Sequence, residues 1–147
     1  MFKSTKKFGP ISTGHRQWLH DGHCSWVHGY GRNVQITFAC NQLDERGWVM
    51  DFGGLKEVKK FLEDEWDHRT LISEHDPLLP DLLELQEKGG ININVMYDPY
   101  GPGIEQSCLF VFDNVNDLIN QKSNRVWVEK VEIWEHENNS AYYSIND

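Results

Sequence analysis

Strict alternation of side-chain type from residue 32 to residue 40 constrains the fold more than any other feature of this sequence. One set of alternate residues is apolar and consists of Val34, Ile36, Phe38 and Cys40. The intervening set consists of Asn33, Gln35, Thr37 and Ala39. Successive side chains of a β-strand point to opposite faces of a sheet, so this pattern predicts a strand with one buried face. His28 and Tyr30 are in phase with Val34, and without an intervening bulge they extend the same face.

Residues 15–30 hold four of the chain's seven histidines and one of its three cysteines. Histidine and cysteine ligate soft or borderline metals, and catalytic zinc sites commonly have three protein ligands and one open position. The histidines of this stretch are therefore candidate zinc ligands. Cys24 lies among these histidines, where its thiolate can be stabilised for acid–base chemistry. The alternative interpretation is a pocket of hydrogen-bonded histidines that packs against Tyr30.

The rest of the chain predicts a mixture of helices and strands. Apolar residues recur at helical spacing, which predicts helices at 55–66, 81–88 and 104–120. Further strands are expected at 2–16, 48–52, 91–96, 125–136 and 141–145. The second of these is expected to pair with strand 32–40 as a hairpin across the turn at 41–47. This order of elements indicates an α+β fold.

Composition limits the class of protein. A length of 147 residues fits one domain, residues 1–147, and a net charge of −9 argues against non-specific binding to nucleic acid. Three cysteines at positions 24, 40 and 108 do not form a disulfide framework, which favours a reducing compartment. The sequence has neither a signal peptide nor an 18-residue apolar span. We therefore expect a cytoplasmic protein that does not bind membranes, with Cys40 and Cys108 as buried apolar residues.

Six motifs occur in order along the chain: Gly-His-Arg at 14–16, Cys-x-x-x-His-Gly at 24–29, Gly-Trp-Val-Met-Asp-Phe-Gly-x-Leu-Lys at 47–56, Asp-His-x-x-Leu at 67–71, Pro-x-x-Glu at 102–105 and a terminal Glu at 135. Together they resemble the zinc-dependent 6-pyruvoyl-tetrahydropterin synthase and 6-carboxytetrahydropterin synthase family. The resemblance implies the tunnelling fold, an antiparallel sheet with helices on one face. In that fold, strands from several subunits close a barrel. It also implies a homohexamer of two stacked trimers, with active sites at subunit interfaces.

The resemblance assigns roles to particular residues. It implies that His15 and His28 bind zinc. It implies a proton-transfer triad of Cys24, Asp67 and His68. It also implies that Glu135 accepts N–H groups of the pterin ring. Glu105 is expected either to support the pterin pocket or to favour the start of its helix through the helix dipole.

One departure from the family concerns the third zinc ligand. The family has a histidine two residues after the second ligand, and this chain has Tyr30 in that place. A tyrosinate can ligate a metal, but the phenol titrates near pH 10 and must first lose its proton. His20 and His23 are the alternatives for this position.

The expected activity is conversion of 7,8-dihydroneopterin triphosphate to 6-carboxy-5,6,7,8-tetrahydropterin, with release of acetaldehyde and triphosphate, for 7-deazaguanine and queuosine synthesis. The stretch from His20 to His23 favours this branch of the family. Elimination of triphosphate to give 6-pyruvoyl-tetrahydropterin is the close alternative. Two further alternatives are a non-catalytic pterin-binding protein and a purely structural oligomer. Four cations are candidates for binding the triphosphate: Arg16, Arg32, Arg69 and Lys122.

Overall fold

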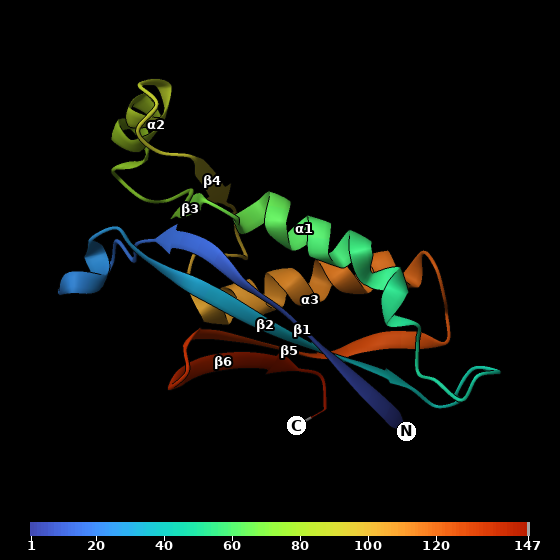
Figure 1. The fold of residues 1–147 in the computed structure, drawn as a ribbon. Coiled ribbons are helices and arrows are strands. Elements are labelled where there is room, and N and C mark those ends of the chain that lie inside the picture. The colour runs from blue at the N-terminus through green and yellow to red at the C-terminus, as the bar shows by residue number, and fades with distance from the viewer. Residues whose placement is uncertain (147) are drawn as a thin grey trace.

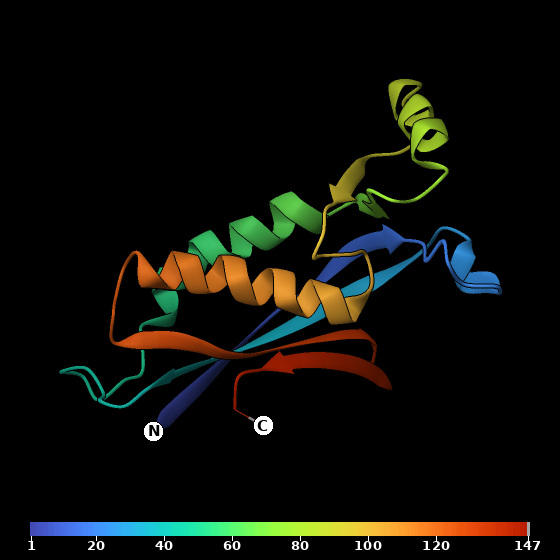
Figure 2. The same ribbon diagram turned by 180° about the vertical axis from the view of Figure 1, so that it is seen from behind.

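Six strands form one curled sheet, with helices α1 and α3 along one side, in the computed structural model, which describes residues 1–146 (Figure 1). The strands are β1 (Phe2–His15), β2 (His28–Cys40), β3 (Arg69–Ser73), β4 (Ile93–Met96), β5 (Val126–His136) and β6 (Asn139–Ser144). The α-helices are α1 (Lys56–Trp66), α2 (Leu79–Glu87) and α3 (Ile104–Asn120). Two 3₁₀ turns are η1 (His23–Ser25) and η2 (Phe52–Leu55). Helix α2 lies apart from α1 and α3, beyond β4 (Figure 2).

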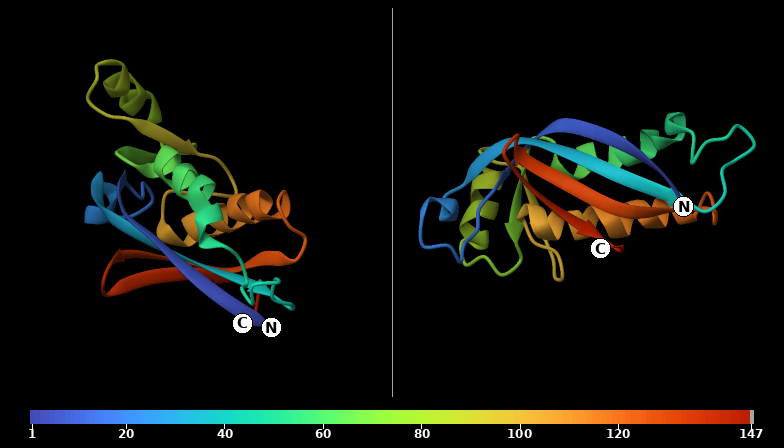
Figure 3. Two further views of the ribbon diagram at one scale, coloured as in Figure 1. Left: turned by 45° about the vertical axis from the view of Figure 1, so that its right-hand side comes forward. Right: turned by 90° about the horizontal axis from the view of Figure 1, so that it is seen from below.

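The strand order is β4-β3-β1-β2-β5-β6, and the sheet is mixed. The four long strands pair antiparallel, as expected, whereas the short strands β3 and β4 run parallel to each other and to the end of β1. Figure 3 shows β1, β2, β5 and β6 side by side with α3 behind them. The predicted α+β fold with helices on one face of the sheet is confirmed. Within the described residues, no helix has the length and apolarity that a membrane crossing requires.

The core lies between this sheet and the two long helices. The alternating apolar residues of β2 form the sheet side of the core, since Val34, Ile36 and Phe38 are fully buried. Helix α1 contributes a buried stripe at Val58, Leu62 and Trp66. Helix α3 contributes Ile104, Ser107, Cys108, Val111, Phe112, Val115 and Ile119. These residues recur at three- and four-residue spacing, so each helix turns one face to the sheet. Cys40 and Cys108 are both fully buried, as predicted.

Two predicted features are wrong. Residues 48–52 do not form a strand, and the hairpin partner of β2 is β1. The Asp44 carboxylate accepts the backbone N–H groups of Arg46 and Trp48 and fixes a loop there. Such side-chain bonds offer the backbone an alternative to strand pairing. Strand β3 was missed because it has five residues and buries Leu71 and Ile72 in succession, which shows no alternation.

A one-residue bulge in β1 determines which side chains of that strand face the core. Before the bulge Phe8 pairs with Val34, and after it Ile11 pairs with Arg32. The extra residue shifts the phase of the strand, because side chains alternate with a period of two. As a result His15 faces the core and lies directly opposite His28 in the pairing register.

A buried ion pair fastens the end of β1 to the connection between β3 and α2. The Arg16 guanidinium donates to both carboxylate oxygens of Asp76, with Nε to Oδ2 at 2.6 Å and Nη2 to Oδ1 at 2.8 Å. Its Nη1 donates to the Ser25 carbonyl at 2.8 Å, which ties down the segment that carries Cys24. The Asp76 side chain has no exposed surface, and that of Arg16 is 11% exposed.

Removing Arg16 alone should therefore be costly. We expect Arg16→Met to lower the free energy of unfolding by about 3–5 kcal/mol, because it leaves the Asp76 carboxylate buried without its partner. The double variant Arg16→Met, Asp76→Leu should recover much of that loss in chemical denaturation. Lys60→Met removes an exposed helix pair with Asp64 and serves as a control with almost no effect. Equal stability of the Arg16 and Lys60 variants would contradict this account.

Candidate metal and pterin site

The imidazoles of His15 and His28 meet at the end of the β1–β2 hairpin. Their Nε2 atoms lie 3.1 Å apart, and the rings meet edge to face with centroids 4.6 Å apart. The Nδ1 of His28 donates to the Trp26 carbonyl at 2.7 Å, which leaves the Nε2 lone pair directed at His15. Two nitrogens bound to one tetrahedral zinc lie about 3.3 Å apart, given Zn–N bonds of about 2.0–2.1 Å. The pair therefore fits a shared metal ion.

The Tyr30 phenol lies on the other side of His15. Its hydroxyl is 3.4 Å from Nδ1 of His15, the ring nitrogen that does not face His28. Burial raises the pKa of the Tyr30 phenol, an effect that the nearby Arg32 opposes. Tyr30 would have to turn its hydroxyl from the Nδ1 side to the Nε2 side of His15 to become a third ligand.

The other candidates for the third ligand lie elsewhere in the structure. The His20 and His23 rings are 6.3 Å apart, and Nδ1 of His20 accepts the Gly22 backbone N–H. Among the described residues, no third His, Cys, Asp or Glu ligand atom joins the His15–His28 pair within 4.8 Å. Within the same residues, such a group of three does form at the surface, from Glu74, His75 and Asp98. The structure therefore places two of the predicted metal ligands together and leaves the third position to another group.

Arg32 is a fully buried cation directly behind this pair. Its Nη2 lies 3.4 Å from Nδ1 of His15 and donates to the Pro102 carbonyl at 2.6 Å. Nη1 donates to the Ser107 hydroxyl at 2.8 Å, and the guanidinium carbon is 4.7 Å from the ring centroid of Trp66. The sequence suggested Arg32 as a possible phosphate ligand. Its position two residues after Tyr30 and two before Val34 predicts a side chain on the core face of β2, and this alternation was the sign that Arg32 is buried.

The two predicted pterin carboxylates lie on different elements. Glu135 lies half-buried near the end of β5, and exposed Glu105 lies in the first turn of α3. The negative charges of both raise the pKa of Tyr30, although less than burial does. Segments far apart in sequence therefore bring two imidazoles and a phenol into contact.

The predicted proton-transfer residues are only partly assembled. Nδ1 of His68 lies 3.1 Å from Oδ1 of Asp67, and both side chains are exposed. His68 has a φ of 56° and donates its backbone N–H to the Ser12 carbonyl. Non-glycine residues with positive φ are concentrated at functional sites. Together with His28 and Tyr30, His68 lines a hollow of about 600 Å³, whereas half-buried Cys24 lies outside that lining.

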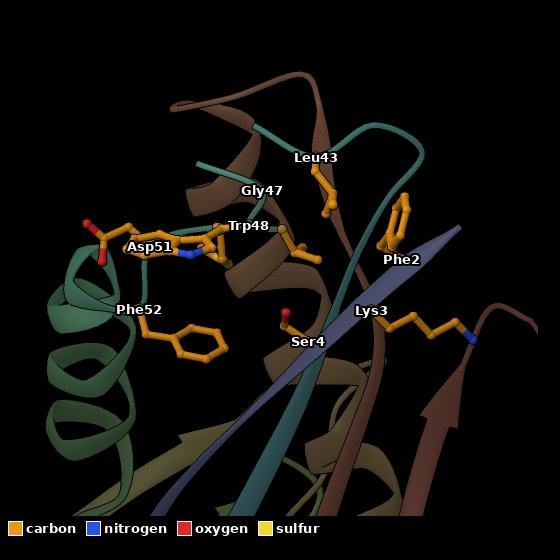
Figure 4. A pocket seen from close by; sticks show the side chains of 10 residues that line it. Phe2, Lys3, Ser4, Leu43, Gly47, Trp48, Asp51 and Phe52 are labelled. Carbon is orange, nitrogen blue, oxygen red and sulfur yellow. The ribbon is translucent and has the colours of Figure 1, made fainter. Parts of the chain in front are cut away.

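The four predicted phosphate-binding cations are already bonded within the chain. Their partners are, in chain order, Asp76, the Ser107 hydroxyl, the Ile93 carbonyl and Glu57. A separate groove of about 500 Å³ lies at the other end of β1 and is mainly apolar (Figure 4). It contains none of the predicted site residues, and its lining includes Phe2, Trp48 and Phe52.

Comparison with known proteins shows the family of the chain. A family model described as 6-pyruvoyl tetrahydropterin synthase matches residues 4–146. The 6-carboxy-5,6,7,8-tetrahydropterin synthase of Aquifex aeolicus is 30% identical over 122 residues, which are 82% of this chain and 75% of that protein. A probable 6-carboxy-5,6,7,8-tetrahydropterin synthase of Halobacterium salinarum is 41% identical over 74 residues, which are 50% of this chain and 46% of that protein. The match to the Rickettsia felis enzyme of the same name covers 61% of its length, at 32% identity over 57% of this chain. The chain thus spans less than two thirds of the length of several curated relatives.

Solved structures share the fold. An uncharacterized protein from Wolinella succinogenes superposes with a TM-score of 0.83 over 99% of this chain and 98% of its own, at 22% identity. The 6-pyruvoyl tetrahydropterin synthase of Caenorhabditis elegans superposes with a TM-score of 0.63 over 98% and 96% of the two chains, at 20% identity. The fold is the tunnelling fold of the pterin synthases. The chain belongs to the 6-pyruvoyl tetrahydropterin synthase family, a family of lyase-type enzymes.

The burial of His15 predicts that the stability of the metal-free protein depends on pH. Burial, and then the charges of Arg32 and His28, lower the pKa of His15 to about 4. Between about pH 6.5 and pH 4 the unfolded chain therefore binds a proton at this residue that the folded chain does not. Stability of the metal-free protein should fall as the pH is lowered through this window, by about 3 kcal/mol at the acid end. Chemical denaturation in a chelator at several pH values should show a shallower pH dependence for His15→Asn, and parallel curves would contradict this assignment.

Proposed function

We propose that this protein is a zinc-dependent lyase that converts 7,8-dihydroneopterin triphosphate to 6-carboxy-5,6,7,8-tetrahydropterin, releasing acetaldehyde and triphosphate. The main support is the His15–His28 pair, whose Nε2 atoms lie 3.1 Å apart. The names of the relatives from Aquifex aeolicus and Halobacterium salinarum favour the 6-carboxy product. Synthesis of 7-deazaguanine, as in queuosine, is the proposed pathway. We also propose a cytoplasmic location, in line with three free cysteines.

In this proposal His15 and His28 hold zinc through Nε2, and Tyr30 is the candidate third donor if its hydroxyl turns toward them. Bound zinc would act as a Lewis acid toward the substrate side chain. Glu135 accepts two neighbouring N–H groups of the pterin, which orients the ring. Glu105 supports the pterin pocket from the start of α3.

Proton transfer falls to the remaining predicted residues. The Asp67 carboxylate accepts from Nδ1 of His68, which leaves Nε2 free to take or give a proton at the hollow. Cys24 supplies the second proton-transfer group through its thiolate. Because Cys24 lies outside the hollow that His68 lines, we propose that the triad is completed between neighbouring subunits.

Open sheet edges support such an assembly. Strand β3 pairs only with residues 13–15 of β1, so the described part of the chain leaves the outer edge of residues 2–10 without a partner strand. The outer edge of β6 is also unpaired within the described residues, and Tyr142 on that strand is 52% exposed. An unpaired strand edge presents free backbone N–H and C=O groups with which another chain can pair. We propose that subunits close the sheet into a barrel and form a homohexamer of two stacked trimers.

The assembly proposal is tested by mass. Light scattering on the purified protein should give six times the 17.2 kDa of one chain, or three times that value after mild dissociation. The expectation follows from strand pairing between copies, which lengthens the sheet until it closes. A monomer at micromolar concentration would overturn this proposal and the shared triad with it.

The reaction is tested by product identity. Mass spectrometry of a reaction with zinc-loaded protein should detect 6-carboxytetrahydropterin and acetaldehyde, whereas 6-pyruvoyl-tetrahydropterin would assign the other branch. His68→Gln should lower turnover by about 10²–10⁴-fold, the usual contribution of a positioned acid or base. His75→Gln is the matched control, because His75 also pairs with an aspartate at the surface but lies outside the site. Pterin binding without metal or turnover would instead indicate a binding protein.

A further inference from the structure

Arg32 carries a buried positive charge without a carboxylate partner. No ion pair within residues 1–146 includes it, and its Nε is a buried donor without an acceptor. Burial of a charge is costly unless the charge is paired and fully hydrogen-bonded. The hydrogen-bond acceptors of its guanidinium are instead neutral oxygens: the Pro102 carbonyl, the Ser107 hydroxyl and the Tyr30 hydroxyl. Its Nη2 also lies 3.4 Å from Nδ1 of His15. A side chain this costly for stability calls for a role outside stability.

The partners of Arg32 come from several segments that carry predicted site residues. His15 lies at the end of β1, and Tyr30 lies on β2, the strand of Arg32 itself. The contacts to Pro102 and Ser107 flank Glu105 at the start of α3. Its stacking partner Trp66 is the last residue of α1, directly before Asp67 and His68. From its place on β2, one planar group thus contacts the end of β1, the start of α3 and the end of α1.

Arg32 itself does not contact substrate. Its side chain has no exposed surface, so a phosphate or pterin cannot reach the guanidinium. Its effect on any ligand must therefore pass through the groups that it holds. The outer partners of metal-binding histidines orient the imidazole, and their loss usually weakens metal binding by about 10–100-fold.

We propose that Arg32 is the positioning residue of this site: its guanidinium holds the Tyr30 hydroxyl beside Nδ1 of His15, the nitrogen that carries the ring proton when Nε2 binds a metal, and holds the starts of α3 and of the Asp67–His68 turn at fixed distances from the histidine pair. This inference rests on the proposed function for the identity of the ligands. The contacts that support it are independent of that function. The fork of five donors on a planar guanidinium suits this role, because lysine cannot reach these segments at once.

The experiment compares Arg32→Lys with Arg125→Lys. Arg125 is also an internal anchor that donates to two backbone carbonyls, those of Gln42 and Val49, but it lies at the far end of α3. Each variant is measured for thermal unfolding, zinc affinity by competition with a chromophoric chelator, and binding of neopterin by its fluorescence. Nitrogen NMR of the metal-free protein reports the bonding of the His15 imidazole directly.

Arg32→Lys should weaken zinc binding by about 10–100-fold and shift the His15 ring signals, while Arg125→Lys changes neither. Neopterin binding should weaken in parallel, because Glu105 loses its support. Unchanged zinc affinity and an unchanged His15 signal in folded Arg32→Lys protein would overturn the proposal. So would an equal loss of zinc affinity in Arg125→Lys, since that indicates general loosening.

A milder variant keeps the test decisive if Arg32→Lys does not fold. Ser107→Ala removes one bond to Arg32 and retains the charge, and it should weaken zinc binding by about tenfold. A Ser107→Ala protein with wild-type zinc affinity would overturn the proposal. If wild-type protein binds zinc but neither binds neopterin nor turns over the triphosphate, the proposed function fails. The zinc and NMR results would still decide the role of Arg32.

Discussion

The antiparallel register between β1 and β2 is the constraint on which the candidate site depends. It places His15 opposite His28 and Thr13 opposite Tyr30, so the two imidazoles share one face at the end of the hairpin. A slip of one residue would turn every side chain of β1 to the other face. The core of β2 prevents such a slip, because Val34, Ile36 and Phe38 must stay beneath the helices. Burial of apolar residues in the middle of the strand therefore maintains the geometry of polar residues at its end.

The site also depends on groups that take no part in chemistry. Arg32 fills the space behind the histidines, and the Arg16–Asp76 pair holds the segment that carries Cys24. Both arginines are bonded inside the chain, so neither is available for an anionic substrate. Under the proposed function, other lysines or arginines must therefore bind the triphosphate.

Regular periodicity predicted most of the fold, and irregular contacts explain the rest. Helix α3 spans the predicted residues 104–120, because its apolar stripe runs unbroken for the whole length. Residues 48–52 looked like a strand by composition, but the side-chain bonds of Asp44 form a loop instead. The pairing of His15 with His28 was available only through the family resemblance, since no local pattern relates them. The burial of Arg32 follows from its phase on β2, but its partners come from distant segments that no spacing rule connects.

The extra residue near Gly9 and Pro10 has a consequence for reading related sequences. Ile11, Thr13 and His15 are buried only because the count of residues before them changes parity at that point. An alignment that closes a gap there by one position would exchange the inner and outer residues of the following segment. Gly14 or Arg16 would then be aligned with the first histidine ligand of a related protein. That histidine would wrongly seem to be absent from this chain. Comparisons across the family should therefore be anchored on β2, whose phase is continuous from His28 to Thr37, and extended outward from it.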